Sequence, residues 1–208
     1  TQNPIHNPIY LQHLVNPRFD LAAPSVILKE KQFNYQELPF EAAWRDKTII
    51  LDGYWQSEKY FKECRKEILA AFNFSWRCNV GTVSVHVRRG DYLLLPQKHP
   101  PVPVSWIERA MLQFPGYRFL FFSDDLPWCR ETFADRADCL FYQGFDEVDD
   151  LTAMTHCEHH ICSASTYSWW GAWLNQNPNK RVIMPKLWFQ LARRENTSDI
   201  VPEEWEKL

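Results

Sequence analysis

The sequence has no apolar run long enough to cross a bilayer and no signal-peptide pattern, so we expect no transmembrane segment within it. It also lacks an excess of positive charge: Lys and Arg number 23 against 26 Asp and Glu, for a formal net charge of −3. We therefore expect no nucleic-acid partner. Internal repeats and low-complexity tracts are absent as well, which leaves an ordinary globular chain.

Cysteine and glycine are sparse, with six of each. The cysteines are spread through a chain too long to need disulfide staples, so a reduced compartment is the better prediction, although an even count permits disulfides. The chain begins at Thr1 rather than Met, and we expect its natural N-terminus to lie outside this sequence.

Aromatic residues, by contrast, are abundant, with ten Trp, fourteen Phe and eight Tyr among 208 residues. With 45% hydrophobic residues, the chain can bury a large core as one large domain or two small ones. An aromatic load of this size sometimes also forms a carbohydrate-facing surface.

Short apolar runs alternate with helical patterns from residue 48 to the end. Residues 1–46 carry five prolines and predict irregular chain with one short strand at 25–28. The later runs predict strands at 48–51, 82–87, 119–122, 140–142, 160–162 and 182–184. Helices are predicted over 57–72, 149–158 and 165–175, and also at a Ser105–Glu108 capping box and at Pro127. This order favours an α/β fold with a Rossmann-like parallel sheet covered on both faces.

Three of the predicted strands end in polar residues. The first cluster is His86 with Arg88-Arg89-Gly90-Asp91-Tyr92, the second is Ser123-Asp124-Asp125, and the third runs from Ser163 to Ser168. Ligands of open parallel sheets bind outside the carboxyl ends of the strands, so these residues can act together.

Together the clusters have the chemistry of a nucleotide site. Adjacent arginines, Arg88 and Arg89, supply fixed positive donors for phosphate oxygens, and Gly90 lets the backbone approach closely or adopt positive φ. Small hydroxyl residues at a helix start add N–H donors and the positive end of the helix dipole. Asp124 or Asp125 can accept a hydrogen bond from a base or a ribose hydroxyl.

Each cluster also has a purely structural interpretation. Arg88 and Arg89 could simply pair with surface carboxylates. Asp124-Asp125 and residues 163–168 could serve only as helix caps. Because each of the three clusters directly follows a strand, we favour one shared ligand site.

Three other patterns invite functional readings that we disfavour. Arg89-Gly90-Asp91 is a cell-adhesion tripeptide, which would need an exposed loop tip, but here it directly follows a strand. Residues 155–162 hold three His and two Cys, but they span a predicted helix-to-strand boundary that would scatter metal ligands. The Trp-rich stretch 169–174 predicts a core helix that supports the third cluster.

Several long motifs occur in a set order along the chain. Residues His86 to Tyr92, Phe122 to Asp125 and 163–174 resemble, in turn, the HxRRGDY, FSDD and S-x-S-S/T-F/Y-S-W-W-G/A-A-W-L motifs of the alpha-1,2-fucosyltransferase family. Softer matches lie at 52–61, 184–189 and 199–205. The resemblance covers about residues 48–208, and several motifs in order are far more specific than any one of them.

The resemblance implies a GT-B-type glycosyltransferase that transfers L-fucose from GDP-fucose to the 2-hydroxyl of a terminal galactoside, with inversion and without a metal or other cofactor. It also implies roles for site residues. Arg88 binds the GDP phosphates with help from Arg89, while His86 and Asp124 or Asp125 lie near the guanosine. The turn around Ser163, Ser165, Thr166, Tyr167 and Ser168 meets the phosphates or the fucose.

The catalytic base is not settled by the sequence. Asp91 is a candidate general base for the acceptor hydroxyl. It could equally be a structural partner of the arginines or the cap of the next turn.

One departure from the family concerns the first domain. Members open with a glycine-rich GGLGNQ-type segment, and none is found here. We therefore expect residues 1–78 to be the remnant of an acceptor-side domain and residues 79–208 to be the GDP-fucose-binding domain. A non-catalytic domain that binds a GDP-sugar is the alternative function. For a bacterial-type member we expect a cytoplasmic location, with at most peripheral contact with the inner membrane.

Overall fold

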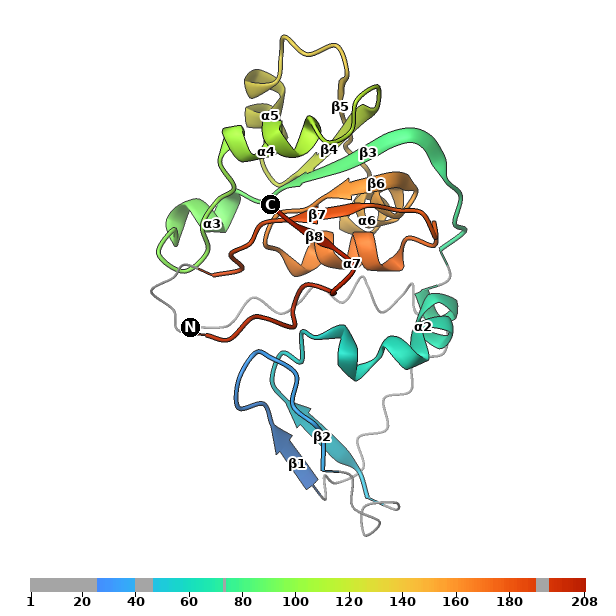
Figure 1. Cartoon of the computed structure of the whole chain (residues 1–208), viewed down its shortest axis with the longest axis vertical. Coiled ribbons are helices and arrows are strands. Elements are labelled where there is room, and N and C mark those ends of the chain that lie inside the picture. Colours follow the sequence, from blue (N-terminus) through green and yellow to red (C-terminus); the bar gives the residue numbers. More distant parts are fainter. Residues whose placement is uncertain (1–25, 40–46, 73, 190–194) are drawn as a thin grey trace. The chain divides into compact units, whose positions relative to one another are not determined.

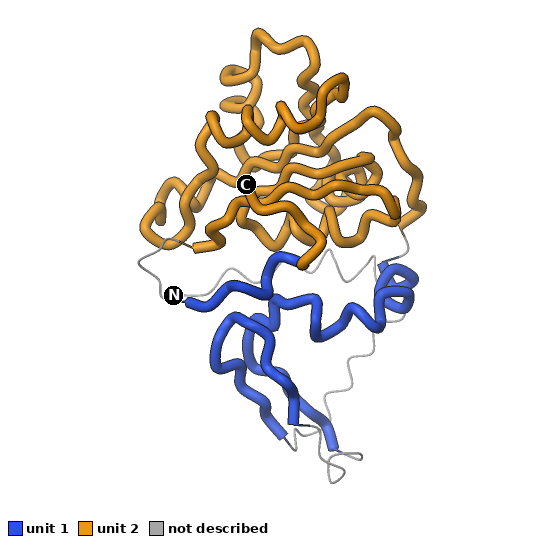
Figure 2. The backbone as a smooth tube through the Cα atoms, in the orientation of Figure 1, with its two compact units in different colours: residues 1–73, 195–202 blue, residues 74–194, 203–208 orange. Residues whose placement is uncertain are grey.

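The computed structural model describes residues 26–39, 47–72, 74–189 and 195–208 (Figure 1). The chain divides into two compact units, 1–73 with 195–202 and 74–194 with 203–208 (Figure 2). Residues 195–202 thus group with the first unit, whereas one domain was predicted over 79–208. The irregular chain expected before residue 25 and at 40–46 lies outside the described residues.

The first unit contains a two-stranded parallel sheet, in which β1 (Val26–Lys29) pairs with β2 (Ile49–Asp52). The single helix predicted over 57–72 is wrong. Ser57 does cap its start, but two 3-10 turns, Glu58–Tyr60 and Lys62–Cys64, precede α2 (Arg65–Phe72). Phe61 separates the two turns with φ −143° and ψ −2°, outside the helical region, so a continuous ladder of helical hydrogen bonds cannot form.

The second unit is built on a six-stranded sheet with strand order β5-β4-β3-β6-β7-β8, in which all neighbouring strands are parallel. Its strands are β3 (Asn79–Val87), β4 (Arg118–Ser123), β5 (Cys139–Phe141), β6 (Cys157–Ile161), β7 (Val182–Met184) and β8 (Glu206–Lys207). The predicted α/β class with a parallel sheet is confirmed. Only β8 was not predicted, because two residues carry no periodic pattern.

Helices cover both faces of this sheet (Figure 1). α4 (Val104–Met111) and α5 (Leu126–Thr132) pack on one face, against a core that includes Val83, Val85 and Val87. α6 (Glu147–Thr155) and α7 (Thr166–Leu174) pack on the other, where Phe122 and Met154 are buried. The predicted alternation of β3 is confirmed, so Ser84 and His86 point to the side of α6 and α7.

Two element boundaries differ from prediction. The Ser105–Glu108 capping box is wrong, because α4 starts at Val104, two residues before the start that a Ser105 cap predicts, and its extended N-cap residue Pro103 makes no side-chain cap. The predicted helix over 149–158 ends at Thr155, and β6 begins at Cys157 rather than His160. Pairing of Cys157 with Asn79 of β3 draws these residues into the sheet.

Candidate functional site

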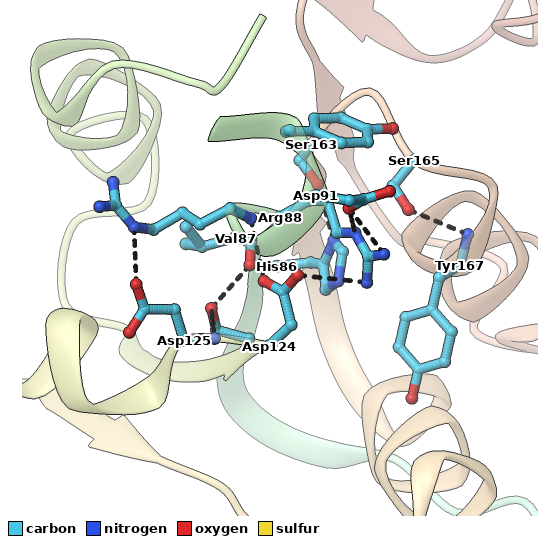
Figure 3. A network of polar contacts seen from close by, with 12 residues as sticks. His86, Val87, Arg88, Asp91, Asp124, Asp125, Ser163, Ser165 and Tyr167 are labelled. Carbon is cyan, nitrogen blue, oxygen red and sulfur yellow. Dashed lines mark hydrogen bonds and ion pairs between the residues drawn. The ribbon is translucent and has the colours of Figure 1, made fainter. Parts of the chain in front are cut away.

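The strand order reverses at β3. The chain runs from β3 outward to β4 and β5, then returns to add β6 and β7 on the other side of β3. The connections that leave β3 and β6 therefore lead to opposite faces, to α4 and to α7. In doubly wound sheets this is where ligands bind. All three predicted polar clusters lie at this carboxyl edge (Figure 3).

Direct bonds join the first cluster to the third. His86 Nδ1 lies 2.7 Å from Ser163 Oγ, and the Tyr92 hydroxyl donates to the Ala164 carbonyl at 2.7 Å. Burial raises the pKa of Tyr92 to about 12, so the hydroxyl remains a donor. The His86 ring also packs against Tyr167, with 5.4 Å between ring centroids. The β3 edge and the start of α7 are thus one connected structure.

The first cluster is also joined to the second, through both arginines. The Arg88 guanidinium pairs with Asp91 at 2.8 Å and with Asp124 Oδ2 at 3.3 Å. The Arg89 backbone N–H donates to Asp124 Oδ1 at 2.9 Å, and its side chain pairs with Asp125 at 3.0 Å. The arginines therefore do pair with carboxylates, as the structural interpretation expected, but these carboxylates belong to the predicted site.

Gly90 is needed for a close approach rather than for its φ angle. A Cβ atom at this position would lie 2.6 Å from Asp124 Oδ2, and Gly90 is not among the glycines with positive φ. The residues after Arg89 form a short helix, α3 (Gly90–Leu94). Gly90 and Asp91 are exposed, but they begin a helix rather than a loop tip, and Arg89 is 19% exposed and paired with Asp125, which disfavours the adhesion interpretation.

Asp125 has two structural roles. Its Oδ1 accepts from the Trp128 N–H at 3.2 Å and caps α5, while its Oδ2 holds Arg89. The Arg89 guanidinium in turn lies 3.7 Å from the centroid of the Trp128 ring. The helix-cap interpretation is therefore right for Asp125, and Arg89 is held against the first turn of α5.

The third cluster divides into buried and accessible residues. Ser163, Ser165 and Ser168 are buried, and the Ser168 hydroxyl donates to the carbonyls of Ser163 and Ser165 at 3.2 Å. Ser165 caps α7 through the Tyr167 N–H at 3.3 Å. Thr166 is exposed. A ligand at this edge would meet Thr166 and those N–H groups of the first turn of α7 that Ser165 does not cap.

The environment of His86 keeps its ring neutral. The side chain is 6% exposed, and burial, followed by the nearby Arg88 charge, lowers the pKa of His86 to about 3. At neutral pH the ring is therefore an uncharged hydrogen-bonding group beside a permanent cation.

The His- and Cys-rich stretch 155–162 is accounted for by separate contacts. His156 Nε2 lies 3.1 Å from the Ser75 carbonyl, and His159 Nε2 lies 3.1 Å from the Tyr117 hydroxyl. His160 lies between Ser84 and Asn175, at 2.7 and 2.8 Å. Among the residues that the structure describes, no three His, Cys, Asp or Glu side chains are arranged to hold a metal ion.

Sequence reasoning missed Trp128 and the contact that Tyr92 makes. Trp128 supports Arg89, and its position three residues after the predicted cap Asp125 was a usable signal. Tyr92 ties α3 to the loop before α7. Its place in the first motif was visible, but a bond to a carbonyl 72 residues away was not.

The family assignment follows from the sequence comparison. The model of glycosyl transferase family 11 matches residues 26–208. The chain belongs to glycosyl transferase family 11. The alpha-1,2-fucosyltransferase resemblance is thereby confirmed at the level of the family.

Three curated proteins show what this family 11 chain is similar to. It is 32% identical over 187 residues to an alpha-1,2-colitosyltransferase of Escherichia coli, covering 77% of the chain and 63% of that protein. It is 33% identical over 140 residues to the Escherichia coli O-antigen biosynthesis glycosyltransferase WbnK, covering 62% and 45%. It is 35% identical over 103 residues to galactoside alpha-(1,2)-fucosyltransferase 1 of Leontocebus fuscicollis, covering 44% and 28%. The chain thus spans less than two thirds of the length of each relative.

Among solved structures, the family 11 chain is similar to POFUT1 in complex with GDP, with a TM-score of 0.39 and 12% identity over 69% of this chain and 56% of that one. A score this low carries no argument about ligand or mechanism. In the described part of the chain, no helix has the length and apolar character needed to cross a membrane.

Proposed function

We propose that this family 11 chain transfers L-fucose from GDP-fucose to the 2-hydroxyl of a terminal galactoside, with inversion at the anomeric carbon. One observation carries the proposal: at the reversal point of the sheet, the edge of β3 that carries the accessible Arg88 is bonded to the turn before α7 through His86 and Tyr92. The names of three relatives support the reaction class, because they specify glycosyl transfer and two specify an alpha-1,2 linkage.

The accessible Arg88 guanidinium and the start of α7 at this edge suit a departing diphosphate. In the transfer, the acceptor oxygen bonds to the anomeric carbon of fucose while the bond from that carbon to the GDP oxygen breaks. Negative charge grows on the GDP, and Arg88 with the N–H groups at the start of α7 would stabilise it there. The Arg88 side chain is 36% exposed, so phosphate oxygens can replace one of its carboxylate partners. We propose no metal or other cofactor for this step.

The proton of the acceptor hydroxyl needs a base or water. Asp91 remains the candidate, because its side chain is 58% exposed and only its Oδ1 is bonded to Arg88. In this arrangement Oδ1 of Asp91 holds Arg88, and Oδ2 is the oxygen that would accept the proton. We also propose the location expected for a bacterial-type member, the cytoplasm with at most peripheral membrane contact.

A second candidate function is the binding of a GDP-sugar without transfer, because the site offers donors for a diphosphate while its candidate base, Asp91, is already paired with Arg88. Colitose is a second candidate for the transferred sugar, because one relative is named an alpha-1,2-colitosyltransferase.

Calorimetric titration with GDP, combined with a transfer assay, tests these proposals. The assay uses GDP-fucose or GDP-colitose as donor and lactose as the galactoside acceptor. Binding of GDP and alpha-1,2 transfer of fucose are expected. Binding without transfer from either donor would favour the non-catalytic alternative. Preferred transfer of colitose would show that the donor is GDP-colitose rather than GDP-fucose. Absence of GDP binding would overturn both functions.

A further inference from the structure

The polar face of β3 carries two similar Ser–His pairs. Ser84 and His86 are two residues apart and point to the same side of the sheet. Ser84 Oγ lies 2.7 Å from His160 Nδ1, and His86 Nδ1 lies 2.7 Å from Ser163 Oγ. The first pair lies within the sheet, and the second lies at its carboxyl edge, beside Arg88 and Tyr167.

The hydrogen-bond partners in the second pair indicate which ring nitrogen of His86 carries the hydrogen. Within the described part of the chain, the Ser163 hydroxyl has no acceptor other than His86 Nδ1. If the hydroxyl donates to Nδ1, that nitrogen is the acceptor of the neutral ring, and Nε2 carries the hydrogen. Nε2 has no partner among the described residues, and it is not a buried unsatisfied atom. The Nε2–H group of His86 is thus available as a hydrogen-bond donor at the edge of the sheet.

We propose that Ser163 is a positioning residue that holds His86 as the neutral Nε2–H tautomer, so that this N–H donates to a diphosphate oxygen of the bound GDP-sugar. The inference rests on the function proposed above and assigns a role within that site. It also places His86 at the diphosphate rather than near the guanosine, and it changes the role of Ser163, which is 1% exposed and cannot touch the ligand.

The surroundings of the pair make the arrangement rigid. The Ser163 carbonyl accepts from the Ser165 N–H at 2.8 Å and from the Ser168 hydroxyl at 3.2 Å, which fixes the turn. The groups that face His86 are the Arg88 cation from the β3–α3 connection and the Tyr167 ring from α7. Burial and Arg88 lower the pKa of the ring to about 3, so the neutral form persists near neutral pH. A neutral donor next to Arg88 avoids placing a second buried cation there.

Nitrogen-15 NMR of the histidine rings reads the tautomer directly in the free protein. We expect His86 to show a protonated Nε2 and an unprotonated Nδ1 from pH 5 to 8, with the Nε2 signal moving when GDP is added. A ring protonated at Nδ1 alone, or one that gains a second proton near pH 6.5, would overturn the proposal.

Paired substitutions test the positioning role. Ser163→Ala removes the hydroxyl and is expected to weaken GDP binding by about tenfold, because the tautomer is no longer fixed. Ser163→Thr keeps the hydroxyl and should recover most of that loss. Ser84→Ala is the matched control: it breaks a bond of the same length, to His160, away from the edge, and should leave GDP affinity unchanged.

Two outcomes of the substitutions contradict the role of Ser163. One is a GDP affinity of Ser163→Ala equal to that of the wild type, and the other is an equal loss in Ser84→Ala. The experiments also distinguish a failure of the proposed function from a failure of the proposed role of Ser163. If GDP binds as expected but no sugar is transferred, only the enzymatic function fails. If the wild type binds no GDP, the proposed function fails, while the ring tautomer still decides whether Ser163 orients His86.

Discussion

Arg88 lies at the end of β3 between two carboxylates, Asp91 at 2.8 Å and Asp124 at 3.3 Å. These contacts hold the guanidinium in a defined position before any phosphate arrives, and its remaining N–H groups can meet one. Such preorganised donors contribute most where charge develops in a transition state. Arg88 is therefore the side chain on which the proposed chemistry depends most.

We predict that Arg88→Ala lowers kcat/KM for fucose transfer by about 100- to 1,000-fold, since removing one such donor raises a barrier by about 2.7–4 kcal/mol. Steady-state rates with GDP-fucose measure the effect. Arg136→Ala is the matched control, because Arg136 is also about one third exposed and pairs with Asp138 at 2.6 Å before β5, away from the site. A folded Arg88→Ala protein with most of the wild-type rate would contradict the assignment.

Substitutions at Asp125 can separate its role as the cap of α5 from its role as the partner of Arg89. Asp125→Ala loses both the cap of α5 and the partner of Arg89, and we expect the free energy of unfolding to fall by about 1–2 kcal/mol. Asp125→Ser keeps a capping oxygen and should lose less, because a partly exposed ion pair contributes little. Urea unfolding of both variants gives the comparison. Equal losses would mean that the cap is not the stabilising contact.

At this scale, the sequence predicted which residues gather but not which of them can touch a ligand. The clusters were visible because each follows a strand. Ser163 and Ser168 looked like ligand contacts, but they are buried and bonded within the turn. A motif shows spacing along the chain, whereas the direction of a hydroxyl depends on neighbours such as His86 that come from another strand.

At the scale of the elements, α6 and α7 can pack closely because α7 has a glycine, Gly171, at the contact. A Cβ atom on Gly171 would overlap the sulfur and Cγ of Met154, which is fully buried on α6. The Tyr167 hydroxyl also donates to the Glu147 carbonyl at 2.5 Å, so the first turns of the two helices are bonded. The packing of this pair therefore sets the position of the turn at the proposed site.

We predict that Gly171→Ala lowers the free energy of unfolding by about 1–3 kcal/mol, because the added methyl group overpacks the α6–α7 contact. Thermal or urea unfolding measures the loss. In the background of Met154→Ala, which leaves room for the methyl group, the same substitution should cost clearly less. A loss of the same size in both backgrounds would show that the contact with Met154 is not its cause.

The order of strands and helices was predictable, but several of their ends were not. The strand β7 was predicted with the observed bounds, since Pro185 follows it directly. The start of β6 was missed because residues 157–159 have no strand pattern of their own and are recruited by pairing with β3. Phe61 likewise breaks a good helical pattern through its local backbone conformation. Tertiary pairing and single backbone angles are not encoded in hydrophobic spacing.

At the scale of the whole molecule, the buried histidines link stability to pH. Burial lowers the pKa of His86 to about 3, and it lowers the pKa of His160 well below its ordinary value. Below pH 6.5 the unfolded chain gains protons on these rings, whereas the folded chain does not. The stability present above pH 6.5 is therefore lost as the pH falls toward 3.

We predict that the free energy of unfolding falls as the pH drops below 6.5, and that each of these two rings contributes about 1.4 kcal/mol to this loss per pH unit. Urea unfolding at pH 7.5, 6.0 and 5.0 measures the slope. His160→Gln cannot take up a proton at this position, so it should have a shallower slope than the wild type. A stability that stays level or rises between pH 7.5 and 5.0 would contradict this account.

The central claim is that the carboxyl edge of β3 and β6 holds a GDP diphosphate, and a crystal structure of the protein with bound GDP tests it most directly. We predict phosphate oxygens within hydrogen-bond distance of the Arg88 guanidinium and of the N–H groups that start α7. GDP bound elsewhere, with Arg88 still held only by Asp91 and Asp124, would contradict the claim.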